Sequence, residues 1–187
     1  MILVVLVILS ILGGGIVLLL QSRYLDASSY DLQERNAMPS ELAQGKLLLS
    51  EQTFRIEQPA RLVAKVDQVF LSPAGQVILM ETKTRYRHKA YLYDILELSI
   101  QALVLRYSDR KPLQQRSIAE YAYVRVVAPD RRPVFLKVKL LTEAAVIAWY
   151  RRYHLIISRR EEPRPATDPK SCLKCPHRTG CDKRLGT

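Results

Sequence analysis

Two kinds of hydrophobic pattern alternate along the chain and predict strands mixed with helices. Residues 61–71 and 76–83 are apolar and rich in β-branched side chains, and the Ser-Pro-Ala-Gly turn at 72–75 joins them, so they predict a β-hairpin. Residues 91–107 lack Gly and Pro and are apolar on most sides, which predicts a buried helix. The other expected elements are a short helix opened by Pro39 with Ser40 as N-cap, strands at 118–128 and 134–140, and a helix at 142–153 with Trp149 in the core. Together they predict an α/β fold with helices flanking a mixed sheet.

A separate segment precedes this domain. Residues 2–20 carry no charge and are almost entirely Leu, Val, Ile and Gly, and a membrane-spanning helix needs about 20 such residues. A secretory signal peptide is the alternative, but no basic residue precedes the apolar run and no small-x-small cleavage site follows it. The first basic residue is Arg23, so the positive-inside rule predicts a single-pass protein with its domain in the cytoplasm. The expected parts are a transmembrane anchor at 1–21, a juxtamembrane linker at 22–39, an α/β domain at 40–160 and a cysteine-containing tail at 161–187.

The charge of the chain indicates a polyanionic partner. Lys and Arg number 29 against 18 Asp and Glu, a formal net charge of +11. Such a balance suits nucleic acid or an anionic membrane surface. One basic cluster, residues 85–89, follows the second hairpin strand directly, and Tyr86 within it has a ring able to stack on an unpaired base. A solvated surface is the alternative for any one cluster. The candidate nucleic-acid contacts are Arg85, Tyr86, Arg87 and Lys89.

The hairpin also carries candidate chemistry. Glu81-Thr82-Lys83 follows an apolar run, and side chains alternate along a strand, so Glu81 and Lys83 share one face. An antiparallel hairpin brings Asp67 close to them. Mg²⁺ or Mn²⁺ prefers oxygen ligands such as these two carboxylates, helped by the backbone carbonyl near Thr82, and a bound metal ion activates water and polarises a phosphoryl oxygen. Lys83 would orient the water or neutralise charge growing on the phosphate. The alternative is two strand-end carboxylates and a solvated lysine.

A polar stripe marks the predicted helix at 91–107. Asp94, Glu97 and Gln101 lie at i, i+3 and i+7, which places them on one side of an otherwise apolar helix. A buried glutamine needs hydrogen-bond partners, and the lysine, a water or a substrate could provide them. The alternative is that the stripe faces solvent.

The order Asp67, Glu81-x-Lys83 and then a helix bearing Gln101 resembles the PD-(D/E)XK nuclease superfamily, and specifically its RecB-like branch. The tail narrows the resemblance to the CRISPR-associated Cas-four exonucleases, because Cys172, Cys175-Pro176 and Cys181 match the cysteines that hold an iron–sulfur cluster there. Pro163-Arg164-Pro165 also fits the segment that leads into those cysteines. The resemblance extends from about residue 47 to residue 185.

This resemblance implies a role for each matching residue. Asp67 and Glu81 would be metal ligands, Lys83 the catalytic lysine, and Gln101 the glutamine of the motif that follows. The family's N-terminal helix usually presents a further histidine or glutamate to the metal. Residues 40–50 contain no histidine here, so Glu41 is the first candidate for that ligand and Glu51 a second.

The cysteine tail leaves several outcomes open. A cubane cluster normally takes four cysteine thiolates, and this chain has three cysteines. Cys172, Cys175 and Cys181 could hold an iron–sulfur cluster with a fourth ligand of another type. A zinc site that recruits His177 or His154 is the alternative, as is a tail that binds nothing. A disulfide would leave one cysteine unpaired.

Together these observations predict a membrane-anchored, Mg²⁺- or Mn²⁺-dependent deoxyribonuclease that hydrolyses phosphodiester bonds, acting as an exonuclease on single-stranded ends. The alternative from another class is a module that keeps the nuclease fold, has weak or no catalysis, and binds nucleic acid or a protein partner at the membrane. A third reading is a membrane-tethered metal or redox sensor built around the cysteine tail.

Overall fold

The computed structural model describes residues 35–110, 113, 115–128, 132–164, 169–173, 175–176 and 178–182. The predicted membrane anchor at 1–21 and most of the predicted linker lie outside these residues. Within them, no helix is both long enough and apolar enough to cross a membrane. The chain divides into two compact units, of which the first ends at Glu143 and the second begins at Ala144. The domain boundaries given above stay predictions.

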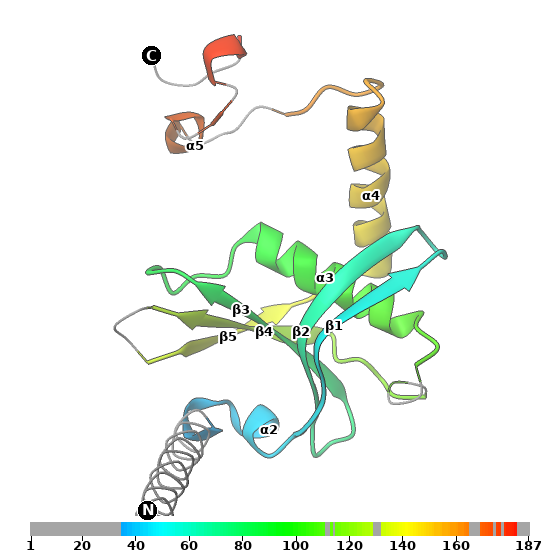
Figure 1. The fold of residues 1–187 in the computed structure, drawn as a ribbon, viewed down its shortest axis with the longest axis vertical. Helices are drawn as coiled ribbons and strands as arrows, with labels where there is room; N and C mark the ends of the chain where they lie inside the picture. The colour runs from blue at the N-terminus through cyan, green and yellow to red at the C-terminus, as the bar shows by residue number, and fades with distance from the viewer. Residues whose placement is uncertain are drawn as a thin grey trace, which may run out of the picture. The chain divides into compact units, whose positions relative to one another are not determined.

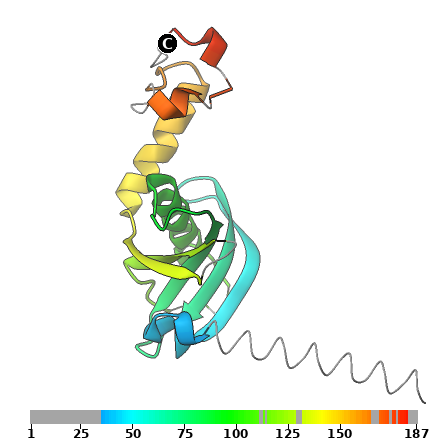
Figure 2. The same cartoon turned by 90° about the vertical axis from the view of Figure 1, so that its left-hand side faces the viewer.

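The first unit is built on a mixed sheet, as predicted, and this sheet has five strands, one more than the hydrophobic pattern predicts (Figure 1). The strands lie in the order β1-β2-β3-β4-β5, and only the β3–β4 pair is parallel. Helix α3 makes the crossover that this parallel pair requires and packs against β1, β2 and β3 (Figure 2). The bounds are β1 Lys46–Ile56, β2 Leu62–Leu71, β3 Val77–Thr84, α3 Leu92–Arg106, β4 Tyr121–Val127 and β5 Val134–Lys139.

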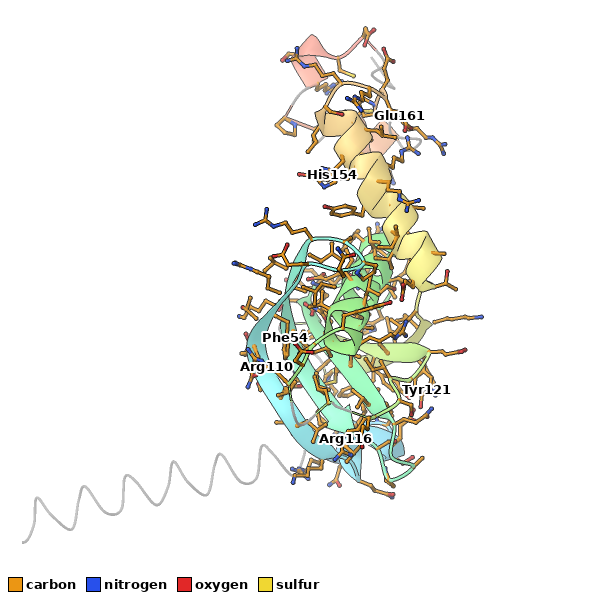
Figure 3. The ribbon with its side chains drawn as sticks, turned by 90° about the vertical axis from the view of Figure 1, so that its right-hand side faces the viewer. Phe54, Arg110, Arg116, Tyr121, His154 and Glu161 are labelled. Carbon is orange, nitrogen blue, oxygen red and sulfur yellow. The ribbon has the colours of Figure 1, made fainter. Side chains whose placement is uncertain are left out.

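The N-terminal part of this unit differs from the prediction. The short helix α2, Ser40–Ala43, ends after one turn, and Pro39 rather than Ser40 is its N-cap, with no side-chain cap hydrogen bond. Gly45 follows, where a Cβ would lie 2.8 Å from the carbonyl oxygen of Glu41, so a larger residue does not fit this turn. The chain then enters β1, a strand that the hydrophobic pattern did not reveal. Arg110, in the loop after α3, lies over the Phe54 ring of this edge strand at 4.3 Å from the centroid (Figure 3).

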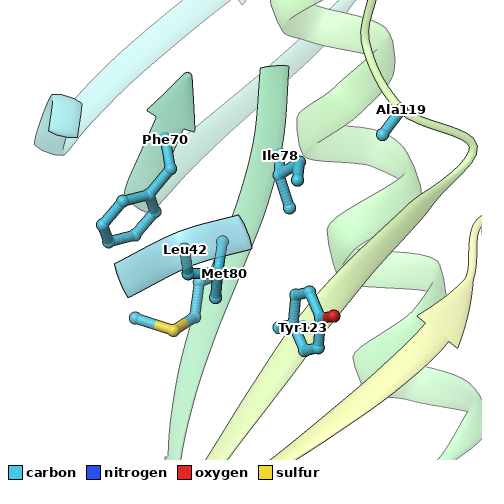
Figure 4. Packing of buried hydrophobic residues seen from close by; sticks show 6 residues of the cluster. All are labelled: Leu42, Phe70, Ile78, Met80, Ala119 and Tyr123. Carbon is cyan, nitrogen blue, oxygen red and sulfur yellow. The ribbon is translucent and has the colours of Figure 1, made fainter. Parts of the chain in front are cut away.

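Strand β3 is the centre of the core because both of its faces are covered. Val77, Ile78, Leu79 and Met80 are each 0% exposed. Alternation along the strand directs Leu79 and Glu81 toward α3 and directs Ile78 and Met80 to the other face. On that second face lies a cluster of buried residues, which Figure 4 shows from close by: Leu42, Phe70, Ile78, Met80, Ala119 and Tyr123.

Helix α2 is fixed to the sheet by a partly buried polar contact beside this cluster. The Glu41 carboxylate accepts hydrogen bonds from the hydroxyls of Tyr121 and Tyr123 and from Lys137 Nζ, the last at 3.1 Å. Burial by itself would raise the pKa of Glu41, but these three donors outweigh it and lower that pKa below its ordinary 4.5. Burial and the Glu41 carboxylate together raise the pKa of Tyr121 to about 12.

We expect Glu41→Ala to lower the free energy of unfolding by about 1–3 kcal/mol at pH 7, because it leaves two partly buried hydroxyls without their acceptor. A carboxyl group with a lowered pKa stabilises the fold above its unfolded pKa. The difference between wild type and variant should therefore be complete above pH 4.5 and shrink as the pH falls below it. Urea unfolding followed by circular dichroism at several pH values measures it, with the exposed Glu120→Ala as control. A difference that does not change with pH would contradict the assignment.

The second unit contains most of helix α4, Glu143–Ile157, and then the short α5, Pro169–Leu173, and the 3₁₀ turn η1, Arg178–Gly180. The prediction that Trp149 belongs to the core is wrong, since this side chain is 44% exposed. Only Val146 is buried along α4. The apolar residues of α4 are distributed over several sides of the helix, so its sequence does not define a single buried face.

Candidate active site

The site begins where the hairpin ladder between β2 and β3 ends. That ladder extends from the Leu71–Val77 pair to the Gln68–Met80 pair. Beyond the ladder, the backbone N–H of Thr82 donates a hydrogen bond to Oδ2 of the Asp67 side chain at 3.0 Å. The contact satisfies a β3 donor and fixes Asp67 next to Glu81. The spacing of the hairpin residues predicted this proximity, and the structure confirms it.

Glu81 is the buried centre of the site. It is 5% exposed, and each carboxylate oxygen accepts a hydrogen bond: Oε1 from Lys83 Nζ at 2.9 Å and Oε2 from Gln101 Nε2 at 2.8 Å. Burial raises the pKa of Glu81, and the hydrogen bonds from Gln101 and Lys83 oppose that rise. The carboxylate is therefore held in place by one charged donor and one neutral donor.

Lys83 is placed between two carboxylates. Besides Glu81, its Nζ donates to Glu97 Oε2 at 2.6 Å. Partial burial by itself would lower the pKa of Lys83, but the hydrogen bonds to Glu97 and Glu81 outweigh it and raise that pKa. The side chain therefore remains an ammonium ion across the neutral range. An ammonium has three N–H donors, so one is left to point at a phosphate oxygen or a water.

Helix α3 supplies the other half of the site, and its polar stripe faces the sheet rather than solvent. Gln101 is 1% exposed, and its Nε2 donates to Lys65 O at 3.0 Å as well as to Glu81. This arrangement uses the amide nitrogen twice and leaves Oε1 buried without a hydrogen-bond partner among the described residues. A buried acceptor of this kind is usually satisfied by an ordered water.

The stripe also contains a buried ion pair. Asp94 is 0% exposed and binds Arg85 through both oxygens, at 3.2 Å to Nη1 and 2.7 Å to Nη2. The same carboxylate accepts the backbone N–H of Tyr91 at 2.7 Å and so caps the start of α3. Hydrogen bonding to Asp94 raises the pKa of Arg85. Arg85, a candidate nucleic-acid contact in the sequence, therefore has a structural partner inside the fold.

The rest of the basic cluster lies on the surface. Tyr86 is 73% exposed, and Arg87, His88 and Lys89 are exposed as well. Their position directly after β3 keeps them close along the chain to Lys83. Binding of nucleic acid by Tyr86, Arg87 and Lys89 stays a prediction.

The two candidates for a further metal ligand lie in different places. Tyr123 pairs with Met80 across β3 and β4, whereas Glu81 pairs with Val124, so Glu41 contacts the sheet face opposite to Glu81. The structure does not bring Glu41 to the site, because α2 packs on the wrong face. Glu51 lies in β1 at a φ of 54° and forms an ion pair with Lys65. The carbonyl of Lys65 binds Gln101, which puts Glu51 closer to the site than Glu41.

Two groups at the site could not be predicted from the sequence. Glu97 belonged to the polar stripe, but nothing in the sequence paired it with Lys83. The backbone carbonyl of Lys65 carries no sequence signal at all. The four-residue spacing of Glu97 and Gln101 was the available clue, since it puts both on one side of α3.

The residues present suit a hard divalent cation by their chemistry. Asp67 and Glu81 supply carboxylate oxygens, and Mg²⁺ is commonly held by one or two protein carboxylates, with waters and substrate phosphate as its other ligands. The buried Oε1 of Gln101 is an acceptor suited to such a water. Among the described residues, no three His, Cys, Asp or Glu side chains are gathered so that they could hold one ion together.

The cysteine tail belongs to the second unit. Cys172 is 8% exposed, Cys175 and Cys181 are half-buried, and the described residues contain no disulfide. The Cys175 N–H donates to Cys172 O at 3.2 Å, and the Cys181 N–H donates to Arg178 O at 3.4 Å. The ring of His154 packs on Tyr150 in α4, and His177 lies outside the described residues. A cluster or zinc at this tail stays a prediction.

No family model matches the chain, and no curated protein resembles it in sequence. Among solved structures it is similar to one titled "Crystal structure of SSO0001", with 17% sequence identity and a TM-score of 0.46. That match covers 74% of this chain and 61% of the other, so it spans less than two thirds of the solved protein.

Proposed function

We propose that this chain is a metal-dependent DNA nuclease of the PD-(D/E)XK type, from the RecB-like branch. One observation carries the proposal: Lys83 and Gln101 bind the buried Glu81 carboxylate, and Asp67 binds the backbone N–H of the adjoining Thr82, so groups from two strands and a helix meet at one place. A fold has no structural need for this combination. A buried charge pair is weak evidence for stability, since apolar residues often replace one without loss.

Each residue then has a chemical role. Asp67 and Glu81, with the backbone carbonyl of Thr82, would hold Mg²⁺ or Mn²⁺, which when bound supplies Lewis-acid activation of water and phosphate. Gln101 fixes one Glu81 oxygen and so presents the carboxylate in a single orientation. Lys83 places a positive charge where negative charge grows on the phosphodiester, and Glu97 holds that ammonium in position.

The proposal also covers the location of the protein in the cell and the role of its cysteine-containing tail. Residues 1–21 would anchor the protein in a membrane with the nuclease in the cytoplasm. Cys172, Cys175 and Cys181 would hold an iron–sulfur cluster, with zinc as the alternative. The positive charge of the chain suits DNA as the substrate.

The test is metal removal. We expect the purified full-length chain in detergent to cleave end-labelled DNA with Mg²⁺ or Mn²⁺, to stop when the ion is chelated, and to recover when it is restored. Cleavage that continues in excess chelator would contradict the proposed chemistry. The products from single-stranded and duplex DNA show which ends are attacked.

A second candidate function has one specific observation in its favour. Both oxygens of Glu81 already accept hydrogen bonds from Lys83 and Gln101, as expected of a site that has become a structural polar network. The protein would then be a binding or assembly module with weak or no catalysis. DNA binding without cleavage, with Mg²⁺ and with Mn²⁺, supports this function and excludes the first.

A further inference from the structure

A groove adjoins the candidate active site on the α3 side of the sheet. It lies between β2 and α3 and has a volume of about 360 Å³. One wall is apolar, formed by Val63 from β2 and by Leu96 and Ile100 from α3. Val63 is 54% exposed. A flat apolar ligand would cover this surface.

The groove is continuous with the catalytic groups. Glu97 and Gln101 line it, and the same side chains bind Lys83 and Glu81. A ligand in the groove would therefore lie beside the ammonium of Lys83. Lys65 also lines the groove, and its exposed ammonium is paired with Glu51. The Lys83 and Lys65 ammoniums, each paired with carboxylates, adjoin an apolar wall, an arrangement able to receive a phosphate attached to a flat ring.

Tyr93 gives the groove an ordered aromatic face. Its ring stacks on Tyr91, with centroids 5.4 Å apart and planes 5° from parallel. Its hydroxyl accepts a hydrogen bond from Arg85 Nη1 at 3.2 Å, and Asp94 fixes Arg85 in turn. Tyr93 is nevertheless 59% exposed. The ring is thus held in one orientation before any ligand binds, which reduces the entropy cost of stacking on it.

We propose that this groove binds an unpaired base of single-stranded nucleic acid, with Tyr93 stacking on the base and the adjoining phosphate lying at Lys83. Base stacking on aromatic side chains, combined with basic groups along the backbone, is the usual means of binding single strands. A duplex keeps its bases stacked inside, so it offers the groove no free ring. The inference rests on the proposed nuclease function and assigns a base-binding position to its single-stranded substrate.

Binding in chelator separates this inference from cleavage. We expect Tyr93→Ala in the full-length chain to weaken binding of a fluorescent single-stranded oligonucleotide by about fivefold or more, since stacking contributes about 1–3 kcal/mol per base. Tyr93→Phe keeps the ring and its stacking on Tyr91 but loses the hydrogen bond from Arg85, so it should bind more tightly than Tyr93→Ala. Tyr153→Ala is the matched control, because Tyr153 is a tyrosine of similar exposure (60%) outside the groove. Binding of the matching duplex should not change. Equal single-strand binding by Tyr93→Ala and wild type would overturn the inference.

Photocrosslinking of the unmodified protein tests the same point without a variant. A single-stranded oligonucleotide carrying 5-iodouracil should crosslink to Tyr93, as mapped by peptide mass spectrometry. Crosslinks found only elsewhere, on Tyr86 or in the second unit, would overturn it. If the wild-type protein does not cleave DNA but its single-strand binding depends on Tyr93, the nuclease proposal is refuted and the groove assignment stands. If the wild-type protein cleaves DNA but its single-strand binding does not depend on Tyr93, only the groove assignment is refuted.

Discussion

Lys83→Met is expected to lower the rate of DNA cleavage by about 10²–10³-fold, the usual cost of removing one group that stabilises transition-state charge. Methionine keeps the length of the side chain and removes the ammonium that lies between Glu81 and Glu97. The pKa of Lys83 is raised, so the wild-type charge is complete below the ordinary lysine value of 10.5 and is lost only above it. Deprotonation of Lys83 should therefore not limit the wild-type rate anywhere in the neutral range.

The matched control is Lys139→Met, an exposed lysine at the end of β5. Initial rates on end-labelled single-stranded DNA, measured with saturating Mg²⁺, compare the two variants with wild type. Circular dichroism shows whether the Lys83 variant stays folded. If Lys83→Met cleaves DNA as fast as Lys139→Met, then Lys83 has no part in the chemistry.

Asp94→Ala should cause the largest loss of stability among single substitutions near the site, about 3–5 kcal/mol in the free energy of unfolding. The cost is large because Arg85, whose side chain is only 15% exposed, would lose its bidentate partner and keep its charge. The first turn of α3 would also lose its cap at the Tyr91 N–H. Urea unfolding followed by circular dichroism measures the loss.

Glu57→Ala provides the comparison, because Glu57 and Arg61 form an exposed pair at 3.5 Å. Removing a surface pair should change the free energy of unfolding by no more than about 1 kcal/mol. The double variant Arg85→Met/Asp94→Leu should recover part of the stability lost in Asp94→Ala, since it removes both buried charges together. Equal losses in Asp94→Ala and Glu57→Ala would show that the buried pair is not the cause.

The hairpin and α3 could be predicted because local signals agree at both. Residues 61–71 and 76–83 are apolar, β-branched runs on either side of a turn sequence, and their expected bounds lie within one residue of β2 and β3. Strand β1 was not predicted because its pattern of hydrophobic and polar residues is irregular. Its register shifts between Leu47 and Leu49, and Glu51 adopts a positive φ, so polar and apolar residues do not alternate along it.

The candidate site likewise contains some contacts that the sequence predicts and others that it does not. Asp67, Glu81 and Lys83 could be placed together because a hairpin and strand alternation fix their proximity. The contacts of Glu97 and Gln101 depend on how α3 docks on the sheet, which no local pattern encodes. Arg85 shows the reverse case, because its place in a basic cluster indicated a surface residue. Its buried partner, Asp94, lies in an element that follows the cluster and is revealed only by the fold.

The most direct measurement is cleavage of end-labelled single-stranded DNA by the full-length chain and by Asp67→Ala, side by side with Mg²⁺ or Mn²⁺. Asp67 is the choice because it is a proposed metal ligand that, among the described residues, accepts one hydrogen bond, from the Thr82 N–H, whereas the Glu81 carboxylate accepts two, so its removal disturbs the fold less than removal of Glu81. We expect metal-dependent cleavage by the wild type and none by the variant. No cleavage by the wild type with either ion, or equal cleavage by the two proteins, would contradict a nuclease built on Asp67, Glu81 and Lys83.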